Sequence, residues 1–302
     1  MLRFLRDYQM KKNIFSAILV CGALLICIAC AGVSSPTAST DNSGTSSGTS
    51  GDSSSGGSSG GSGSGGSSHS TFNNLHSQDG WTGYALLPPS YAICVSCVST
   101  GPEDTWSMTQ NVRVPSQTGN SAKFEIGGTT PYSDVLWNQH LIGDLSSQGL
   151  PDAGRSLNPS LHNFTYDVNF YGDNLETSQA LEFDVNQFVN GRSLIWGHEC
   201  RIGGGHEWDI WDNVAQKWHA TGIACNPASK AWNHLVIQVQ RTSSDQLLFQ
   251  SITLNGTTNI LNYSEPSTTS DWYGVTINYQ MDGNYTQQSY AVYLDKLNFR
   301  YW

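Results

Sequence analysis

Residues 164–170 read Phe-Thr-Tyr-Asp-Val-Asn-Phe, and this stretch decides the fold class. Large apolar side chains occupy every second position, and Thr, Asp and Asn lie between them. Because side chains of a β-strand point alternately to its two faces, the pattern predicts a strand with one face in a core and one face on a polar surface. The same alternation returns at residues 234–240 and 275–280. These segments predict a sheet protein.

Nine further segments have the composition of strands, and Gly-rich, Asn-Gly or Asp-Gly breakers separate many of them. No stretch of a dozen residues keeps the 3.6-residue period of a helix. About twelve strands in about 230 residues predict an all-β fold, a two-sheet antiparallel β-sandwich of jelly-roll type. The nine segments are 104–114, 121–127, 132–142, 179–189, 193–202, 206–212, 217–224, 246–254 and 288–302.

The chain divides into three parts. Residues 1–30 have the order of a signal peptide, with either Met1 or Met10 as the start. Residues 31–70 are almost entirely Ser, Gly and Thr, a composition that predicts a disordered linker. Residues 71–302 contain all ten Trp and are long enough for one β-sandwich domain.

The first 30 residues predict export. Four basic residues lie in residues 1–12, and an apolar run that ends in small residues follows at 14–30. Residues 28–30, Ile-Ala-Cys, resemble a bacterial lipoprotein signal, and this resemblance implies lipidation of Cys30. Cleavage near Gly32 without a lipid, or an uncleaved anchor, are the alternatives. We expect either a lipoprotein anchored on the outer face of a bacterial membrane or a secreted protein.

Composition limits the partners. The net charge is −10, with 14 basic and 24 acidic residues. Without residues 1–29, which hold four basic and one acidic residue, the net charge becomes −13. Such a surface repels phosphate backbones, so we expect no nucleic-acid partner. Only 13% of the residues are charged, whereas Asn, Gln, Ser, Thr and aromatic residues are abundant. A surface of this composition suits neutral polar ligands such as sugars. We expect a monomer.

Four cysteines lie in the predicted domain, and an even number in an exported chain favours disulfides. Of the three pairings, we favour Cys94 with Cys97 and Cys200 with Cys225, because only two residues separate the first pair. The spacing of the first pair also occurs in redox and zinc sites. The chain lacks the βαβ context and the second CxxC that would support those readings.

Residues 181–188, Leu-Glu-Phe-Asp-Val-Asn-Gln-Phe, form the most informative strand. In a regular strand Glu182, Asp184 and Asn186 share one face, and the residues between them share the other. The sequence therefore predicts carboxylates along an open face above an apolar core.

This strand resembles the E-x-D-x-(x)-E signature of laminarinase and lichenase type enzymes in the concanavalin A-like lectin/glucanase superfamily. Residues 293–299 resemble the last core strand of that superfamily. The resemblance implies a jelly roll, with Glu182 as nucleophile and Asp184 as its assistant. The acid/base position falls on Asn186 in a regular strand and on Gln187 in a bulged one. Neither amide can act as a general acid, so ordinary retaining hydrolysis lacks its second carboxyl group.

A neighbouring strand would have to supply the missing acid. Glu199, Glu207 or Asp209 would face Glu182 across a groove, and inverting chemistry tolerates about 6.5–9.5 Å between the carboxyl groups. This alternative makes the protein an active polysaccharide hydrolase or lyase.

The favoured hypothesis is a carbohydrate-binding module, a degenerate relative of the glycosidases. Carboxylates, amides and Trp rings on one face make a sugar-binding groove. Trp208 and Trp211 are three residues apart, so they point to opposite faces of a continuous strand. A third hypothesis is an adhesion or structural domain. The candidate ligand-binding residues are Glu182, Asp184, Asn186, Gln187, Trp137, Trp196, His198, Trp208 and Trp211.

Three histidines raise the question of a metal. His198, His206 and His219 lie near Glu199 and Asp209 in the sequence. Histidines on separate strands more often bond a backbone carbonyl or solvent, so we expect no metal among them. The superfamily resemblance allows a structural calcium elsewhere, and we expect no other cofactor.

Overall fold

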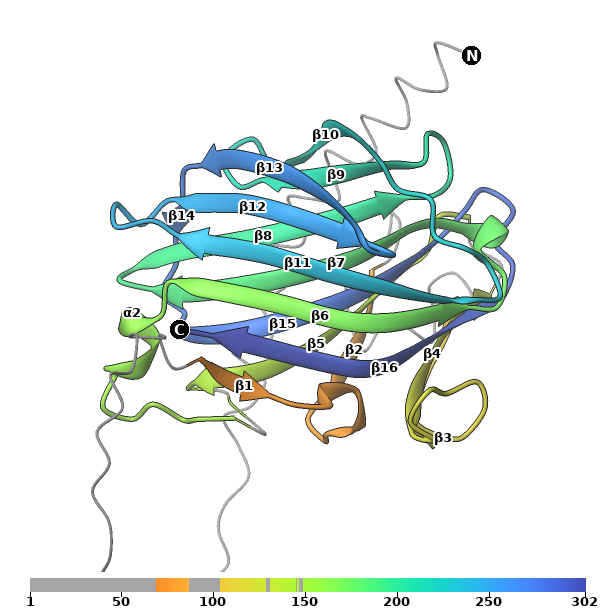
Figure 1. Ribbon diagram of the computed structural model, residues 1–302, viewed down its shortest axis with the longest axis horizontal. Coiled ribbons are helices and arrows are strands. Elements are labelled where there is room, and N and C mark those ends of the chain that lie inside the picture. The colour runs from red at the N-terminus through yellow and green to blue at the C-terminus, as the bar shows by residue number, and fades with distance from the viewer. Residues whose placement is uncertain (1–68, 87–103, 129–130, 145, 147–148) are drawn as a thin grey trace, which may run out of the picture.

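The structure of the protein is a computed structural model that describes residues 69–86, 104–128, 131–144, 146 and 149–302. Two antiparallel sheets of eight strands each pack face to face (Figure 1). This arrangement confirms the all-β, two-sheet sandwich. Short helical turns connect some of the strands, namely η2 (Leu75–Ser77), α2 (Leu157–Ser160) and η4 (Leu175–Thr177).

The first sheet, sheet A, has the order β13-β12-β11-β6-β16-β4-β3, and β1 pairs with β16. Its strands are β1 (Ser70–Phe72), β3 (Asp104–Val112), β4 (Ser121–Gly128), β6 (Asn163–Gly172), β11 (Trp232–Arg241), β12 (Leu247–Leu254), β13 (Thr257–Glu265) and β16 (Tyr290–Tyr301).

The second sheet, sheet B, has the order β10-β9-β8-β7-β15-β5-β2, and β14 pairs with β8. Its strands are β2 (Thr82–Leu86), β5 (Asp134–Gly143), β7 (Ser178–Val189), β8 (Arg192–Arg201), β9 (Glu207–Asp212), β10 (Lys217–Ala224), β14 (Thr268–Thr269) and β15 (Gly274–Gly283).

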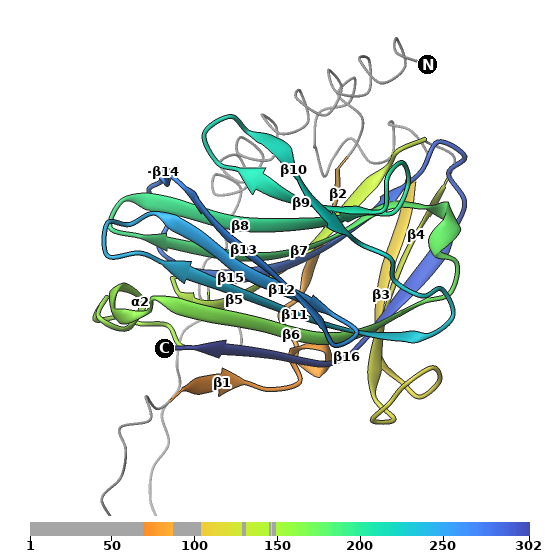
Figure 2. The same ribbon diagram turned by 45° about the horizontal axis from the view of Figure 1, so that its top comes forward.

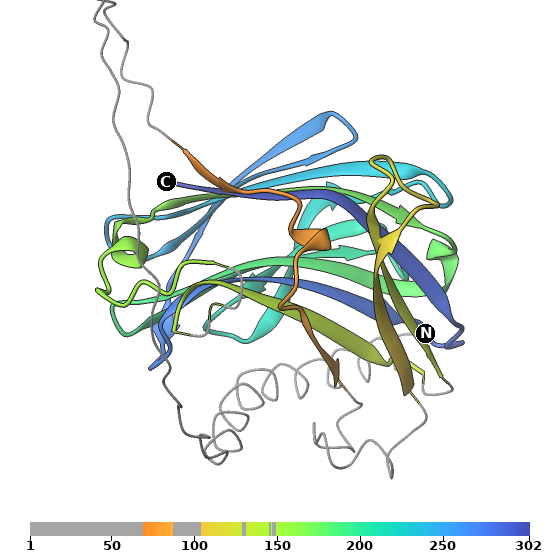
Figure 3. The same cartoon turned by 90° about the horizontal axis from the view of Figure 1, so that it is seen from below.

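Figure 3 shows the two layers from below. Aromatic side chains fill the space between them. The ring of Phe183 on β7 lies 6.0 Å from Tyr166 and 5.5 Å from Phe170 of sheet A, centroid to centroid. It also lies 5.4 Å from Tyr279 of β15. Burial of rings of this size contributes much of the free energy that holds the sheets together. The inward face of β7 is thereby fixed.

The segment from β1 to β2 crosses from sheet A to sheet B and closes one side of the sandwich (Figure 3). His76 in this crossing is buried, and its Nε2 donates to the Asn120 carbonyl oxygen at 2.9 Å. Its Nδ1 accepts the backbone N–H of Leu297 at 3.2 Å. Burial lowers the pKa of His76, although the charge of Asp295 opposes the shift. The neutral ring therefore joins three segments that are distant in the sequence.

A disulfide joins Cys200, near the end of β8, to Cys225, just after β10. Their Cα atoms are 5.6 Å apart, within the usual range for the bond. This pairing is confirmed, and it holds together the β8, β9 and β10 edge of sheet B (Figure 2). Cys94, Cys97 and Cys30 lie outside the described residues, as do the predicted signal and linker.

The twelve strand segments expected from the sequence are all present. Strands β1, β2, β13 and β14 were not among them. Strand β13 lacks the expected pattern because it lies at the edge of sheet A and alternates between exposed and half-buried positions as far as the buried Glu265. The Asn255-Gly256 breaker forms the turn before it, and both residues have positive φ angles, 51° and 82°. Among the described residues, no helix is long and apolar enough to cross a membrane.

Candidate functional site

The strand that carries Glu182 is regular. β7 pairs with β15 and β8 without a register shift between residues 182 and 188. Since Phe183 faces the core, Glu182, Asp184 and Asn186 lie on the side of sheet B turned away from sheet A, which we call the outer face. The position corresponding to the acid/base is therefore Asn186.

A row of residues crosses the outer face at the level of Asp184, one from each of six strands. We call it the amide row, and it brings together segments more than 130 residues apart. In order from β5 to β10 it consists of Asn138, Asn278, Asp184, Gly197, Trp211 and Trp218.

Asp184 sets the direction of hydrogen bonding in this row. Its Oδ2 accepts the Nδ2 of Asn278 at 3.3 Å, and the Oδ1 of Asn278 accepts the Nδ2 of Asn138 at 2.5 Å. An ionised carboxylate has no hydrogen to donate, so each amide must turn its nitrogen toward Asp184 and its oxygen away. Each of the two amides thus uses one of its N–H groups within the row.

Two further amides on the outer face follow the same arrangement. The Nε2 of Gln280 donates to Asp282 Oδ1 at 2.9 Å, and the Nδ2 of Asn186 donates to Thr276 Oγ1 at 3.2 Å. Four oxygens then accept no hydrogen bond from any described residue, and they belong to Asn138 (Oδ1), Asp184 (Oδ1), Asn186 (Oδ1) and Gln280 (Oε1).

These oxygens are held out of bulk water. The side chains of Asp184, Asn186 and Gln280 belong to residues that are 5%, 5% and 4% exposed. A buried acceptor without a donor costs about 1–3 kcal/mol, so each of the four needs a donor that the described residues do not supply. The outer face is therefore an acceptor surface.

Gly197 allows Trp211 and Trp218 to approach Asp184 closely. A Cβ at this position would lie 2.8 Å from the Trp211 Cβ, 3.3 Å from the Trp218 ring and 3.4 Å from Asp184 Oδ1. A larger residue would close the space between the carboxylate and the two indoles. Trp211 and Trp218 pack edge to face, with their ring centroids 5.4 Å apart. They form an aromatic wall at the β9 and β10 end of the amide row.

A second row, the carboxylate row, runs parallel to the first. Gln280, Glu182, Glu199 and Asp209 lie opposite one another on β15, β7, β8 and β9. Arg201 beside this row donates to Asp209 at 2.8 Å and to Glu207 at 2.9 Å. Of the three expected acids, Glu199 lies directly opposite Glu182, whereas Glu207 and Asp209 are ion-paired with Arg201.

Five candidate ligand residues lie away from the outer face. Trp137, Trp196, Trp208 and His198 are buried at 2% exposure or less within the core between the sheets. Gln187 is also buried, and its Nε2 donates to the Asn158 carbonyl oxygen, the Asn158 Oδ1 and the Leu161 carbonyl oxygen. Each of these residues occupies a position of its strand that points inward, toward the core. We therefore leave them out of the candidate site.

The sequence alternation of β8 already indicated that Trp196 and His198 point inward. Trp196 and His198 have the same parity as Cys200, which is buried with its disulfide. Sequence reasoning also missed Asn138, Asn278, Gln280 and Trp218, which are the polar or outward positions of recognised strands. The register between distant strands was needed to place them beside Asp184.

The histidines do not form a metal site. Within the described ranges, no group of three or more His, Cys, Asp or Glu side chains is placed to hold a metal ion. The Nδ1 of His198 donates to the Trp196 carbonyl oxygen at 3.1 Å, and burial lowers its pKa to about 4. The ring of His219 stacks on Tyr263 of sheet A with centroids 5.2 Å apart.

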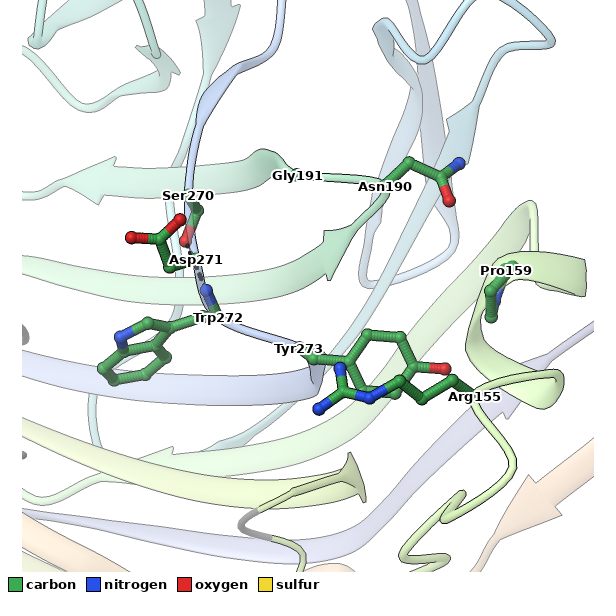
Figure 4. Close-up of a pocket in the computed structure, with 8 residues that line it drawn as sticks. All are labelled: Arg155, Pro159, Asn190, Gly191, Ser270, Asp271, Trp272 and Tyr273. Carbon is green, nitrogen blue, oxygen red and sulfur yellow. Dashed lines mark hydrogen bonds between the residues drawn. The ribbon is translucent and has the colours of Figure 1, made fainter.

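A pocket of about 410 Å³ lies at the end of sheet B, where Trp272 packs 5.4 Å from the ring of Phe188. Figure 4 shows Arg155 lying across the ring of Tyr273, at 4.3 Å from its centroid. Arg155 also pairs with Asp144 at 2.8 Å. No residue of this lining has a buried polar atom that lacks a partner. The acceptor surface, rather than this pocket, is the stronger candidate site.

Comparisons with known proteins find only distant structural similarities. No protein-family model matches the sequence, and no curated protein matches it. Similar solved structures include a conserved carbohydrate esterase from the Shiga toxin-encoding bacteriophage phi24B, at 12% identity and a TM-score of 0.40, covering 77% of this chain and 99% of that chain.

Two lectins are similar to a comparable degree. Peanut lectin has 11% identity and a TM-score of 0.37, with coverage of 78% of this chain and 97% of the lectin. Lectin II from Ulex europaeus has 12% identity and a TM-score of 0.36, with the same coverage. At these identities and TM-scores, the ligands and activities of the three proteins carry no argument about this chain. The function must be argued from the outer face itself.

The pKa of Asp184 offers a test of the outer face. Burial raises the pKa of Asp184 to about 7, and the charges of Asp282 and Glu199 act in the same direction, while hydrogen bonds from the Asn278 amide and the His198 backbone N–H oppose the shift. In the protonated form the proton lies on Oδ1, because Oδ2 accepts from Asn278. The orientation of the amide row is therefore the same in both states.

We expect Asp184 to make the folded protein less stable as the pH rises. The pKa of an unfolded Asp is about 3.9, so between about pH 4 and pH 7 the folded state holds more protons than the unfolded state. Stability from this group is lost across that window. Relative to Asp184→Asn, the wild-type protein should be more stable at about pH 4.5 than at about pH 7.5 in urea unfolding.

The exposed Asp271 provides the control, because Asp271→Asn should show no such change between the two pH values. A constant stability difference between the wild type and Asp184→Asn across the window would contradict a raised pKa.

Proposed function

We propose that the outer face of sheet B binds a carbohydrate, in a protein that its sequence predicts to be exported. The single observation that carries this proposal is the set of four acceptors, on Asn138, Asp184, Asn186 and Gln280, that have no donor among the described residues. A sugar presents several hydroxyl hydrogens at short intervals, so one ligand can donate to several of these oxygens.

The aromatic wall supports the same proposal. Trp211 and Trp218 end the amide row next to Asp184. Trp211 is buried at 6% exposure, whereas Trp218 is partly exposed. The indole ring of Trp218 offers an apolar surface for the C–H side of a pyranose ring. Acceptors beside a stacking surface match a ligand that has hydroxyls at its rim and an apolar face.

Glycan binding is expected to depend on the acceptors of the outer face. The full chain should bind at least one polymer in a panel of immobilised polysaccharides. Asn186→Ala removes one acceptor and should weaken that binding about tenfold, the value of one hydrogen bond of about 1–1.5 kcal/mol. Titration with oligosaccharides of the same polymer measures the change.

Asn169→Ala is the matched control, because Asn169 is an amide of β6 in the other sheet. It should leave the affinity unchanged. Failure to bind every glycan of the panel would refute the proposal and favour an adhesion or structural domain. Equal weakening by both variants would remove the outer face from the binding site.

A specific observation also favours a second candidate, a polysaccharide hydrolase. Glu182 and Glu199 are directly opposite on β7 and β8. Cβ atoms of such cross-strand pairs are about 4.5–5.5 Å apart, and retaining glycosidases need carboxyl groups about 5–5.5 Å apart. One of the two would act as nucleophile and the other as acid, in place of the amide at position 186.

This candidate predicts release of reducing ends from the polymer that the protein binds. Glu182→Gln should lower the release at least about hundredfold and preserve binding, because the amide keeps the size of the carboxylate but cannot act as nucleophile. Glu125→Gln in sheet A is the matched control and should keep full activity. The absence of products from every polymer that binds would leave a binding module only.

A further inference from the structure

We infer that the outer face selects glycans that carry protonated amines, that is oligosaccharides of amino sugars whose nitrogens are not acylated. This inference rests on the proposed carbohydrate binding and names its ligand class. Its first basis is the hydrogen-bonding character of the face.

The four unpartnered atoms of the outer face are all acceptors. The amide nitrogens of Asn138, Asn278, Asn186 and Gln280 each donate one hydrogen to a neighbouring oxygen. A sugar hydroxyl brings one hydrogen and two lone pairs, so it can satisfy one of these acceptors. An ammonium brings three hydrogens and no lone pair. A group that only donates therefore complements the four oxygens better than a hydroxyl does.

The negative charge of the outer face also favours an ammonium group. The carboxylate row places Glu182, Glu199 and Asp209 on three adjacent strands, next to Asp184. The charges of Glu199 and Asp282 both act on Asp184, whose Oδ1 has no partner among the described residues. A cation beside Asp184 would be stabilised by this field, and its hydrogen bonds would be charge-assisted.

Arg201 offsets part of this negative charge. Its guanidinium contacts Asp209 and Glu207, at 2.8 Å and 2.9 Å, and its Nη1 donates to the Gly204 carbonyl oxygen. The charge of Glu199 also acts on Arg201, but no contact between Arg201 and Asp184 is among the interactions of the described residues. The same negative field opposes uronic acids and sulfated sugars, which carry acceptors and negative charge to a surface that already has both.

Two observations favour an amino sugar over other cations. The described residues contain no group of acidic, His or Cys side chains placed to hold a metal ion. The aromatic wall lies in the same row as Asp184, separated from it only by Gly197. A pyranose ring on the partly exposed Trp218 would bring its amine toward Asp184 and its hydroxyls toward Asn278 and Asn138. A simple polyamine has no such ring to stack.

The test uses calorimetric titration of the full chain, in buffer with EDTA, against three tetrasaccharides that differ in one substituent. These are the tetramers of glucosamine, N-acetylglucosamine and glucose. At neutral pH and about 50 mM salt, the glucosamine tetramer should bind at least about tenfold more tightly than the other two, and the ratio should fall at about 500 mM salt because the charges are screened.

Asp184→Asn keeps the shape of the side chain and removes its charge. It should reduce the preference for the glucosamine tetramer to less than about threefold. Asp167→Asn is the matched control on sheet A and should preserve the full preference. If Asp184→Asn fails to fold, the comparison of the three sugars and its salt dependence on the wild-type protein still decide the matter.

The outcomes separate the two claims. Equal or tighter binding of the N-acetylated or glucose tetramer, or binding only to other glycans, would overturn the amine selectivity and leave carbohydrate binding intact. Spermine that binds as tightly as the glucosamine tetramer would overturn selection of a sugar. Failure of every glycan, including the polysaccharide panel, would refute the proposed function itself.

Discussion

The carboxylate of Asp184 determines how the outer face of sheet B presents its hydrogen-bonding groups. An ionised carboxylate only accepts, so Asn278 must turn its nitrogen inward along the row, and Asn138 must follow. The result is that oxygens without a described donor remain for a donor from outside. An apolar side chain at position 184 would leave the two amides without a fixed direction.

This arrangement depends on the regular alternation of β7. The strand lies between β15 and β8 near the middle of sheet B, so one side of it carries Phe183 into the core and the other carries Asp184. Gly197 lets Trp211 and Trp218 pack close to Asp184, and the Cys200–Cys225 disulfide holds the edge that carries the two indoles. The core and the candidate site are thus two faces of the same strands, and neither face can shift without the other.

Local alternation was sufficient to predict the sandwich and one side of the site. The period of two at residues 164–170 and 181–188 placed Glu182, Asp184 and Asn186 together and twelve strands in the domain. It failed for β13, whose positions at the sheet edge are mostly exposed or half-buried, so that burial imposes no hydrophobic pattern there. Composition alone also overestimated the Trp residues as binding surfaces, since Trp137, Trp196 and Trp208 are in the core.

The positions of Asn278 and Asn138 in the site could not be predicted from local sequence patterns. Asn278 lies 94 positions from Asp184, and Asn138 lies 140 positions from Asn278. Their adjacency follows from the pairing of β15 with β7 and β5, which period-two patterns do not encode. The parity of each strand predicts which side chains share its face, but only the register says which strands bring those faces together.

The central claim is that donors from a bound sugar satisfy the four unpartnered oxygens of the outer face. A crystal structure of the protein with an oligosaccharide selected from the binding panel tests it most directly. Ligand O–H or N–H groups should lie within hydrogen-bonding distance of at least three of the oxygens on Asn138, Asp184, Asn186 and Gln280, with one sugar ring against Trp218. An oligosaccharide bound elsewhere, with these four oxygens unchanged, would contradict it.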